Sequence, residues 1–178
     1  MLRLFSGTNN IRLSSQVAKL LKIPLSQSEV VHFEDSEVRI RLIDDVKNQT
    51  CVIIQPTSNP ADSSFMELCF FADAMRRAEA KKIIAVIPYL GYARQNIQHR
   101  PGEAVSINVI IRFLETVGID EVVAFDLHDE ATQGIFSIPF THLSGLGALA
   151  QAVKEYLGKK MIVVPKMSSE GIIPSLIR

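Results

Sequence analysis

Two arginines and a glutamine follow an apolar run, at the place where a buried strand would end. The run covers residues 83–87, and Arg94, Gln95 and Arg100 come after it. A guanidinium in such a loop could clamp phosphate oxygens through two parallel hydrogen bonds. The pattern alone nevertheless favours the plainer interpretation, in which both arginines are solvated loop cations.

A carboxylate and an imidazole follow the next apolar run, residues 122–125. Asp126 and His128 are two residues apart, and they could converge on a metal ion if Leu127 turns inward. The alternative makes Asp126 the N-cap of a helix and His128 a satisfied polar residue. Spacing alone favours this alternative.

An acidic stretch near the amino terminus offers a third candidate site. Residues 38–42 alternate between apolar and basic side chains, as a half-exposed strand does, so the acidic stretch before them is predicted to be a hairpin turn. Phe33 could stack on a base there, and Asp35 and Glu37 could accept hydrogen bonds from it. Equally, Phe33 could belong to the core and the acids to a solvated turn.

The elements that must position these side chains alternate along the chain. Apolar runs without alternation suit strands that are covered on both faces, and amphipathic stretches between them suit helices. The predicted strands cover residues 52–55, 83–87, 122–125 and 162–164, and the predicted helices cover residues 11–21, 62–80, 106–117 and 148–157. Gly118 predicts the end of the helix over residues 106–117. The order predicts an α/β fold, a mainly parallel sheet flanked by helices, with a small β-hairpin.

Length, charge and cysteine content bound the type of protein. The 178 residues suit one domain, and 19 basic side chains balance 19 acidic ones, which gives no indication of nucleic acid or of an anionic membrane as partner. No apolar run has the length of a membrane span, and the first residues do not resemble a secretory signal. Cys51 and Cys69 are interpreted as buried thiols of a reducing compartment, so the cytoplasm is expected.

The motifs in order resemble the ribose-phosphate diphosphokinase (phosphoribosyl pyrophosphate synthetase) family. The most specific are Ile-Pro-Tyr-Leu-Gly-Tyr-Ala-Arg-Gln at 87–95, Asp-Leu-His at 126–128 and Gln-Gly-Ile-Phe-Ser-Ile-Pro at 133–139. The resemblance implies phosphoribosyltransferase-type α/β domains. It also implies transfer of the pyrophosphoryl group of Mg-ATP to the C1 hydroxyl of ribose 5-phosphate, which gives phosphoribosyl pyrophosphate and AMP.

The resemblance also implies roles for individual residues. Arg94 and Gln95 would bind ATP, with Arg94 on the phosphates, and His128 with Asp126 would hold Mg²⁺. The hairpin residues Phe33, Asp35 and Glu37 would bind the adenine of an ATP molecule that is held mainly by a neighbouring subunit. This arrangement implies a homo-oligomer. Arg100 and Lys166 are further candidates for phosphate.

Three departures from the family pattern affect this interpretation. Asn96, Ile97 and Gln98 stand where the family usually has an acid and several bases. Lys166 stands where the family has a carboxylate near the metal, which should repel a second Mg²⁺. Family chains are also nearly twice as long, so residues 1–178 are expected to form a single N-terminal domain, with a C-terminal domain absent or only begun at 165–178. Ribose 5-phosphate would then bind only if that second domain were supplied.

Three functions are therefore considered. The first is the ATP and Mg²⁺ half of a ribose-phosphate diphosphokinase. The second is a regulatory or assembly subunit that binds a full-length synthetase without turnover, which the neutral stretch 96–98 and Lys166 motivate. The third, a compact phosphoribosyltransferase, ranks last because we find no acidic pair in a Gly-Thr-rich loop.

Overall fold

The computed structural model of the chain describes residues 1–157. The predicted strand at 162–164, Lys166 and the segment 165–178 lie outside the described residues. One compact unit covers Met1–Leu143, and a second begins at Ser144. The prediction of a single domain over residues 1–178 therefore stays a prediction.

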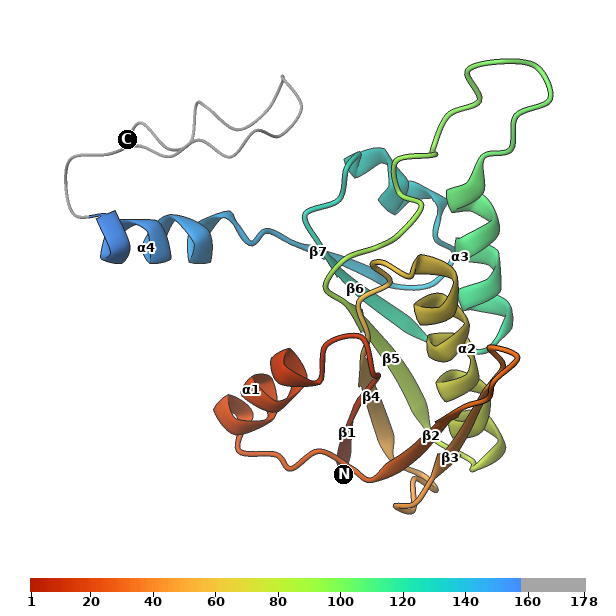
Figure 1. Cartoon of the computed structure of the whole chain (residues 1–178), viewed down its shortest axis with the longest axis vertical. Helices are drawn as coiled ribbons and strands as arrows, with labels where there is room; N and C mark the ends of the chain where they lie inside the picture. The colour runs from red at the N-terminus through yellow and green to blue at the C-terminus, as the bar shows by residue number, and fades with distance from the viewer. Residues whose placement is uncertain (158–178) are drawn as a thin grey trace. The chain divides into compact units, whose positions relative to one another are not determined.

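A five-stranded parallel sheet forms the centre of the first unit (Figure 1). Its spatial order is β1-β4-β5-β6-β7, and each pair of neighbours is parallel. The strands are β1 (Leu2–Ser6), β4 (Thr50–Ile54), β5 (Lys82–Ile87), β6 (Glu121–Phe125) and β7 (Phe140–Leu143). The mainly parallel sheet is confirmed, but β7 was not predicted, because four residues are too few to show a strand pattern.

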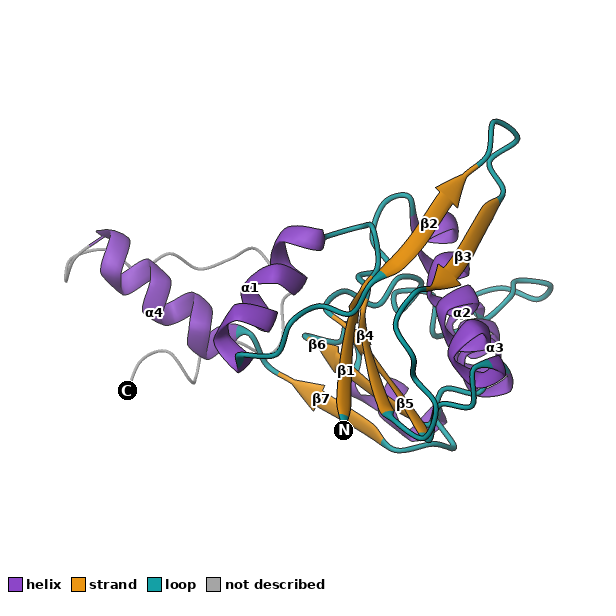
Figure 2. Ribbon diagram, turned by 90° about the horizontal axis from the view of Figure 1, so that it is seen from below, coloured by secondary structure: helices purple, strands orange, loops and turns teal. Residues whose placement is uncertain are grey.

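Helices cover both faces of this sheet (Figure 2). The helices of the first unit are α1 (Ile11–Leu21), α2 (Ala61–Arg77), α3 (Ser106–Thr116) and the 3₁₀ helix η1 (Glu130–Ile135). The main core lies between α2, α3 and one face of the sheet, whereas a smaller cluster of Leu4, Ala18 and Ile54 joins α1 to the other face. Alternate residues of β4 and β5 therefore enter different clusters, as the two-residue period of a strand requires.

The second unit contains α4 (Leu146–Leu157) within the described residues. Its position agrees with the helix predicted at 148–157. In the described part of the chain, no helix combines the length and the apolar character that crossing a membrane requires.

The predicted hairpin is also present. β2 (Ser28–His32) and β3 (Val38–Leu42) pair antiparallel in a sheet of their own. The inward-facing Val30, Ile40 and Leu42 pack against the main core, and β3 contacts α2. The hairpin is thus anchored along one side while its turn stays exposed.

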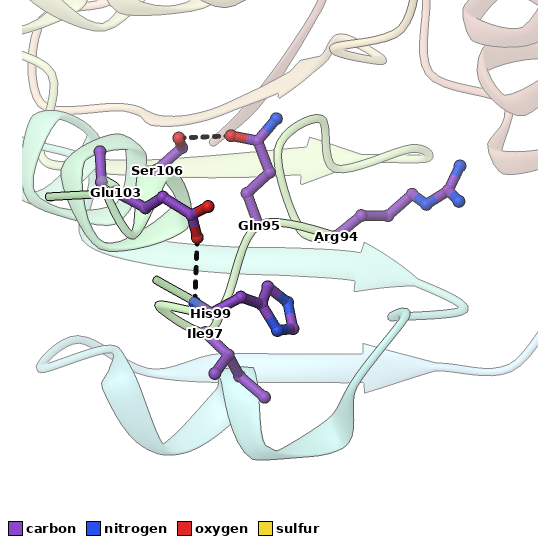
Figure 3. A pocket seen from close by; sticks show the side chains of 7 residues that line it. Arg94, Gln95, Ile97, His99, Glu103 and Ser106 are labelled. Carbon is purple, nitrogen blue, oxygen red and sulfur yellow. Dashed lines mark hydrogen bonds between the residues drawn. The ribbon is translucent and has the colours of Figure 1, made fainter. Parts of the chain in front are cut away.

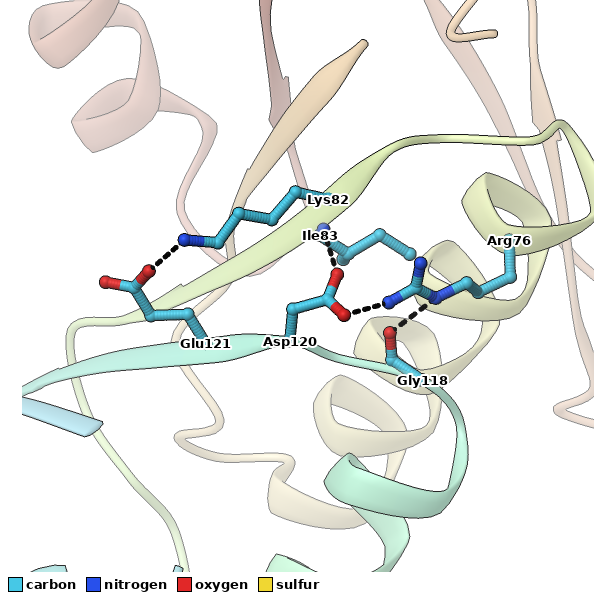
Figure 4. A network of polar contacts seen from close by, with 6 residues as sticks. All are labelled: Arg76, Lys82, Ile83, Gly118, Asp120 and Glu121. Carbon is cyan, nitrogen blue, oxygen red and sulfur yellow. Dashed lines mark hydrogen bonds and ion pairs between the residues drawn. The ribbon is translucent and has the colours of Figure 1, made fainter. Parts of the chain in front are cut away.

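A polar network fixes the amino-terminal edge of the sheet, opposite the candidate site (Figure 4). Arg76, at the end of α2, donates from Nε to the carbonyl of Gly118 over 2.7 Å and pairs with the Asp120 carboxylate. Asp120 also accepts from the backbone N–H of Ile83 over 2.7 Å. Gly118 has φ 98°, and a Cβ there would lie 2.8 Å from Arg76 Nε, so a glycine is required. This network sets where α2 and α3 stand against the strands.

Candidate functional site

The candidate site is built at the carboxyl ends of neighbouring strands. β5 and β6 pair directly, with Ile87 opposite Ala124, so the loops that follow them leave the same edge of the sheet. One loop carries Arg94 and Gln95, and the other carries Asp126 and His128. In open parallel sheets this edge is where ligands bind.

The loop after β5 is fixed by the end of β4. Thr57 donates from its backbone N–H to the carbonyl of Tyr89 over 2.9 Å, and its hydroxyl accepts from the N–H of Gly91 over 2.8 Å. A Cβ on Gly91 would lie 2.5 Å from the Thr57 carbonyl oxygen, which only glycine avoids. Leu90 and Ala93 are buried in the core. The backbone just before Arg94 is therefore held firmly.

Tyr92 bends this loop toward α2. Its φ of 61° is a conformation that non-glycine residues seldom adopt and that often occurs at functional sites. The phenol donates a hydrogen bond to Asp62 in the first turn of α2, and this bond raises the pKa of Tyr92. The Tyr92 carbonyl then accepts from the N–H of Gln95 over 2.9 Å. This turn sets the directions in which Arg94 and Gln95 leave the backbone.

Arg94 and Gln95 point in different directions (Figure 3). The Gln95 side-chain oxygen accepts from the hydroxyl of Ser106, the first residue of α3, over 2.6 Å. Arg94 is exposed and extends away from that pair, and its guanidinium has no hydrogen bond or ion pair within residues 1–157. A pocket of about 330 Å³ lies here, lined by Arg94, Gln95, Ile97, His99, Glu103, Ala104 and Ser106. An unpaired guanidinium beside a pocket can receive an anion.

Arg100 lies in a separate turn of the same loop. The carboxylate of Glu103 accepts from the backbone N–H groups of His99 and Arg100, each over 3.0 Å. Arg100 is exposed and does not line the pocket. It is therefore a solvated cation in this arrangement, and its role in phosphate binding stays a prediction.

The turn after β6 presents Asp126 and His128 together. Leu127 between them is buried, whereas Asp126 and His128 are exposed, so the inward turn that convergence requires is present. The Leu127 N–H donates to Nε2 of His142 on β7 over 3.1 Å, and Asp126 has φ 43°. The alternative of an N-cap at Asp126 is wrong, because Asp129 caps η1 by accepting from Ala131 N–H over 2.9 Å.

A side-chain hydrogen bond joins the two loops. Nδ2 of Asn96 donates to Oδ2 of Asp129 over 2.5 Å, across 33 residues of sequence. Asn96 departs from the family pattern, in which an acid usually stands at this position. Because its amide is neutral and carries N–H groups, it can donate to the Asp129 carboxylate, which an acid would repel.

A buried polar network lies at the end of β1, and its role was missed in the sequence. Both oxygens of Glu67 accept from Thr8, one from the backbone N–H over 2.6 Å and one from the hydroxyl over 2.5 Å. Glu67 is only 2% exposed. An acid on the core face of the helix, between Ser64 and Phe71, is the signal that could have revealed it, because a buried carboxylate requires partners. The network holds the loop from β1 into α1.

The turn between β2 and β3 lies apart from the loop between β5 and α3 (Figure 1). Phe33 is 45% exposed, so the alternative that it belongs to the core is wrong, and the Arg39 guanidinium carbon lies 5.8 Å from its ring centroid. Asp35 accepts from the N–H of Glu37 over 3.1 Å. Within one chain the structure does not bring these residues to the pocket.

The donor set fits a loosely held Mg²⁺ better than a dedicated metal cage. Among residues 1–157 no cluster of three or more His, Cys, Asp or Glu side chains could hold a metal ion. Mg²⁺ commonly uses one or two protein ligands and completes its shell with substrate phosphates and water. Asp126 and His128 could supply such a partial set.

These features define a class of protein. It is an open parallel α/β domain whose ligand site lies at adjoining strand ends, where a guanidinium and the Asp-Leu-His turn could receive an anionic ligand. The family model described as the N-terminal domain of ribose phosphate pyrophosphokinase matches residues 2–118. The chain belongs to the ribose-phosphate pyrophosphokinase family, which is the family the motifs predicted.

Individual relatives agree with this assignment. The chain is 37% identical over 164 residues to the ribose-phosphate pyrophosphokinase of Fusobacterium nucleatum, covering 91% of this chain and 52% of that one. It is 39% identical over 150 residues to the Bacillus subtilis protein of the same name, covering 84% and 47%. The crystal structure of phosphoribosylpyrophosphate synthetase from Mycobacterium smegmatis matches with a TM-score of 0.79 and 31% identity, covering 87% of this chain and 52% of that one. The predicted phosphoribosyltransferase-like fold is therefore confirmed, and the chain spans about half the length of these relatives.

Proposed function

We propose that this chain supplies the ATP and Mg²⁺ side of a ribose-phosphate pyrophosphokinase. The observation that carries the proposal is the unpaired Arg94 guanidinium on the loop next to the Asp126–His128 turn, at adjoining ends of β5 and β6. Family membership supports the reaction, which transfers the pyrophosphoryl group of ATP to the C1 hydroxyl of ribose 5-phosphate. A bond forms between that oxygen and the β-phosphorus as the bond from the α-phosphate to the β-phosphorus breaks, and AMP leaves.

In this proposal the residues of the chain orient and neutralise the triphosphate. Arg94 binds phosphate oxygens through paired N–H groups, and Gln95, held by Ser106, lines the same pocket. His128 and Asp126 would hold the Mg²⁺ ion, which would supply neutralisation of phosphate charge and orientation of the phosphate oxygens. Such transfers depend mainly on positioning and electrostatics, which is what fixed loops at a sheet edge can provide.

The hairpin would act on a neighbouring copy. Phe33 exposes almost half of its side chain and does not line the pocket beside Arg94, so its ring is accessible to an adenine bound by another subunit. The proposal therefore includes a homo-oligomer, or association with a full-length synthetase, in the cytoplasm. Ribose 5-phosphate would be bound by the other half of a complete enzyme.

No observation favours the regulatory alternative. The relatives described above are named as enzymes, and Asn96, one reason for that alternative, makes a specific hydrogen bond within the site.

The test is calorimetric titration of the Arg94→Ala variant with Mg-ATP. We expect affinity to fall about 10- to 100-fold, because hydrogen bonds to charged groups contribute about 1.5–3 kcal/mol. Arg112→Ala is the matched control, since Arg112 is an exposed arginine on α3 without an ion pair in the described part of the chain. Equal affinity in wild type and Arg94→Ala would refute the assignment of this site.

A further inference from the structure

A hydrogen bond between the side chains of Asn96 and Asp129 joins the two loops of the candidate site. Asn96 Nδ2 lies 2.5 Å from Asp129 Oδ2, and both side chains are partly buried. The other oxygen, Oδ1 of Asp129, accepts from the N–H of Ala131 over 2.9 Å. Each carboxylate oxygen therefore has its own donor.

The chemistry of the pair fixes which groups face each other. An ionised carboxylate only accepts, so the group of Asn96 that faces it must be the amide nitrogen. A hydrogen bond to a charged acceptor is shorter and stronger than one between neutral groups. An aspartate at 96 would instead set two carboxylates against each other.

The pair connects the phosphate-binding residue to the metal-binding turn. Asn96 follows Arg94 and Gln95 directly, in the long loop 88–105, and Asp129 follows His128 directly. Thr57 and Tyr92 fix the loop before Arg94, and Ser106 holds Gln95. The Asn96 bond adds a restraint toward β6, which lets the two loops keep one relative position before a ligand arrives.

We propose that Asn96 and Asp129 are a positioning pair that holds Arg94 in register with His128, so that one triphosphate contacts both. The inference rests on the proposed function for the role of the ligand. Neither residue needs to touch ATP. The pair lowers the cost of ordering the loop on binding, because that ordering is already present in the free protein.

Exchanging the two side chains tests the pair directly. In the double variant Asn96→Asp/Asp129→Asn, the amide oxygen introduced at position 129 can still cap Ala131 while the amide nitrogen there donates to the new carboxylate at position 96. Both bonds are kept, and donor and acceptor are reversed only in the bond between positions 96 and 129. Asn96→Asp alone opposes two carboxylates, whereas Asp129→Asn alone lets the Asn96 amide turn its oxygen toward the new amide.

We expect a specific order of Mg-ATP affinities by calorimetry. Asn96→Asp weakens binding at least about 10-fold, Asp129→Asn weakens it less than about 3-fold, and the double variant returns to within about 3-fold of wild type. Gln98→Glu is the control, since it adds the same charge to the same loop. Gln98 is exposed, and within residues 1–157 it has no hydrogen bond with Asp129. A double variant as weak as Asn96→Asp, or Gln98→Glu equally weak, would overturn the proposal.

Amide hydrogen exchange separates this inference from the proposed function. Gln95 and Ala131 have hydrogen-bonded N–H groups on the two loops. Their exchange should quicken in Asn96→Asp and recover in the double variant, with or without ATP. If wild type fails to bind Mg-ATP, the proposed function fails, and recovery of protection still supports the coupling of the loops. Unchanged protection in Asn96→Asp would overturn the proposal that the pair couples the two loops. Lost protection with unchanged affinity for Mg-ATP would also overturn it, because the pair would then be merely structural.

Discussion

At the scale of single residues, the sequence identified which side chains could do chemistry but not what they contact. Arg94, Asp126 and His128 follow apolar runs, and the rule for strand ends predicts their location. The bond from Asn96 to Asp129 joins positions 33 residues apart, and the bond from Gln95 to Ser106 joins two loop ends. The first bond depends on how the strands are ordered in the sheet and the second on how the loop between β5 and α3 turns back on itself, and local sequence patterns contain neither.

The two cysteines give a prediction at the same scale. Burial raises the pKa of Cys51 to about 11 and that of Cys69 to about 12, so both thiols stay protonated at neutral pH. Because the thiolate is the nucleophile, we expect neither to react with a disulfide reagent at pH 8 until the protein is unfolded in guanidinium. Rapid reaction of both thiols in the folded protein would contradict the burial described here.

The same pKa shifts predict how stability depends on pH. A thiol whose pKa is raised by folding holds its proton where the unfolded chain has released it, so the unfolded state binds fewer protons above about pH 8.5. The free energy of unfolding should therefore be unaffected by these groups below that pH. It should fall between about pH 9 and the raised values, by up to about 1.4 kcal/mol per pH unit for each thiol. Denaturant titrations of wild type and Cys69→Ala at pH 7 and 10 measure this loss of free energy of unfolding. An equal loss between the two pH values in both proteins would contradict the contribution of Cys69.

At the scale of elements, helical and strand periodicity predicted most positions, and long-range contacts decided the rest. The helix that was expected to end at residue 80 ends at Arg77. The neighbouring Arg76 donates a hydrogen bond to the Gly118 carbonyl and forms an ion pair with Asp120. The apolar strands predicted a sheet covered on both faces. Within the described residues, however, the face toward α2 and α3 is fully buried and the other is mostly half-buried.

Arg76 gives the prediction that belongs to this scale. Arg76→Ala leaves the Gly118 carbonyl without its side-chain donor and the Asp120 carboxylate with the N–H of Ile83 but without its ion pair, so we expect the free energy of unfolding to fall by about 1–3 kcal/mol. Arg77→Ala is the matched control, because Arg77 is exposed and, within residues 1–157, pairs only with Asp73 one turn earlier, where an ion pair contributes little. Denaturant titration of both variants measures the difference. Equal losses would mean that the network does not fix α2 to the sheet.

At the scale of the whole molecule, the chain spans about half the length of its relatives. The described unit Met1–Leu143 contains the Arg94 loop, the Asp126 turn and the hairpin β2–β3. The proposal therefore assigns the triphosphate to this chain and ribose 5-phosphate to the other half. Lys166 lies outside the described residues, so its predicted effect on phosphate or metal binding stays a prediction.

Titration of the chain with Mg-ATP, in the absence and presence of ribose 5-phosphate, tests the central claim most directly. We predict saturable binding of Mg-ATP whose affinity changes less than about 2-fold when ribose 5-phosphate is added, since a ligand without a site on the chain cannot shift the binding equilibrium. Absence of Mg-ATP binding, in a sample whose circular dichroism shows it to be folded, would contradict the claim that this chain is the nucleotide side of the enzyme.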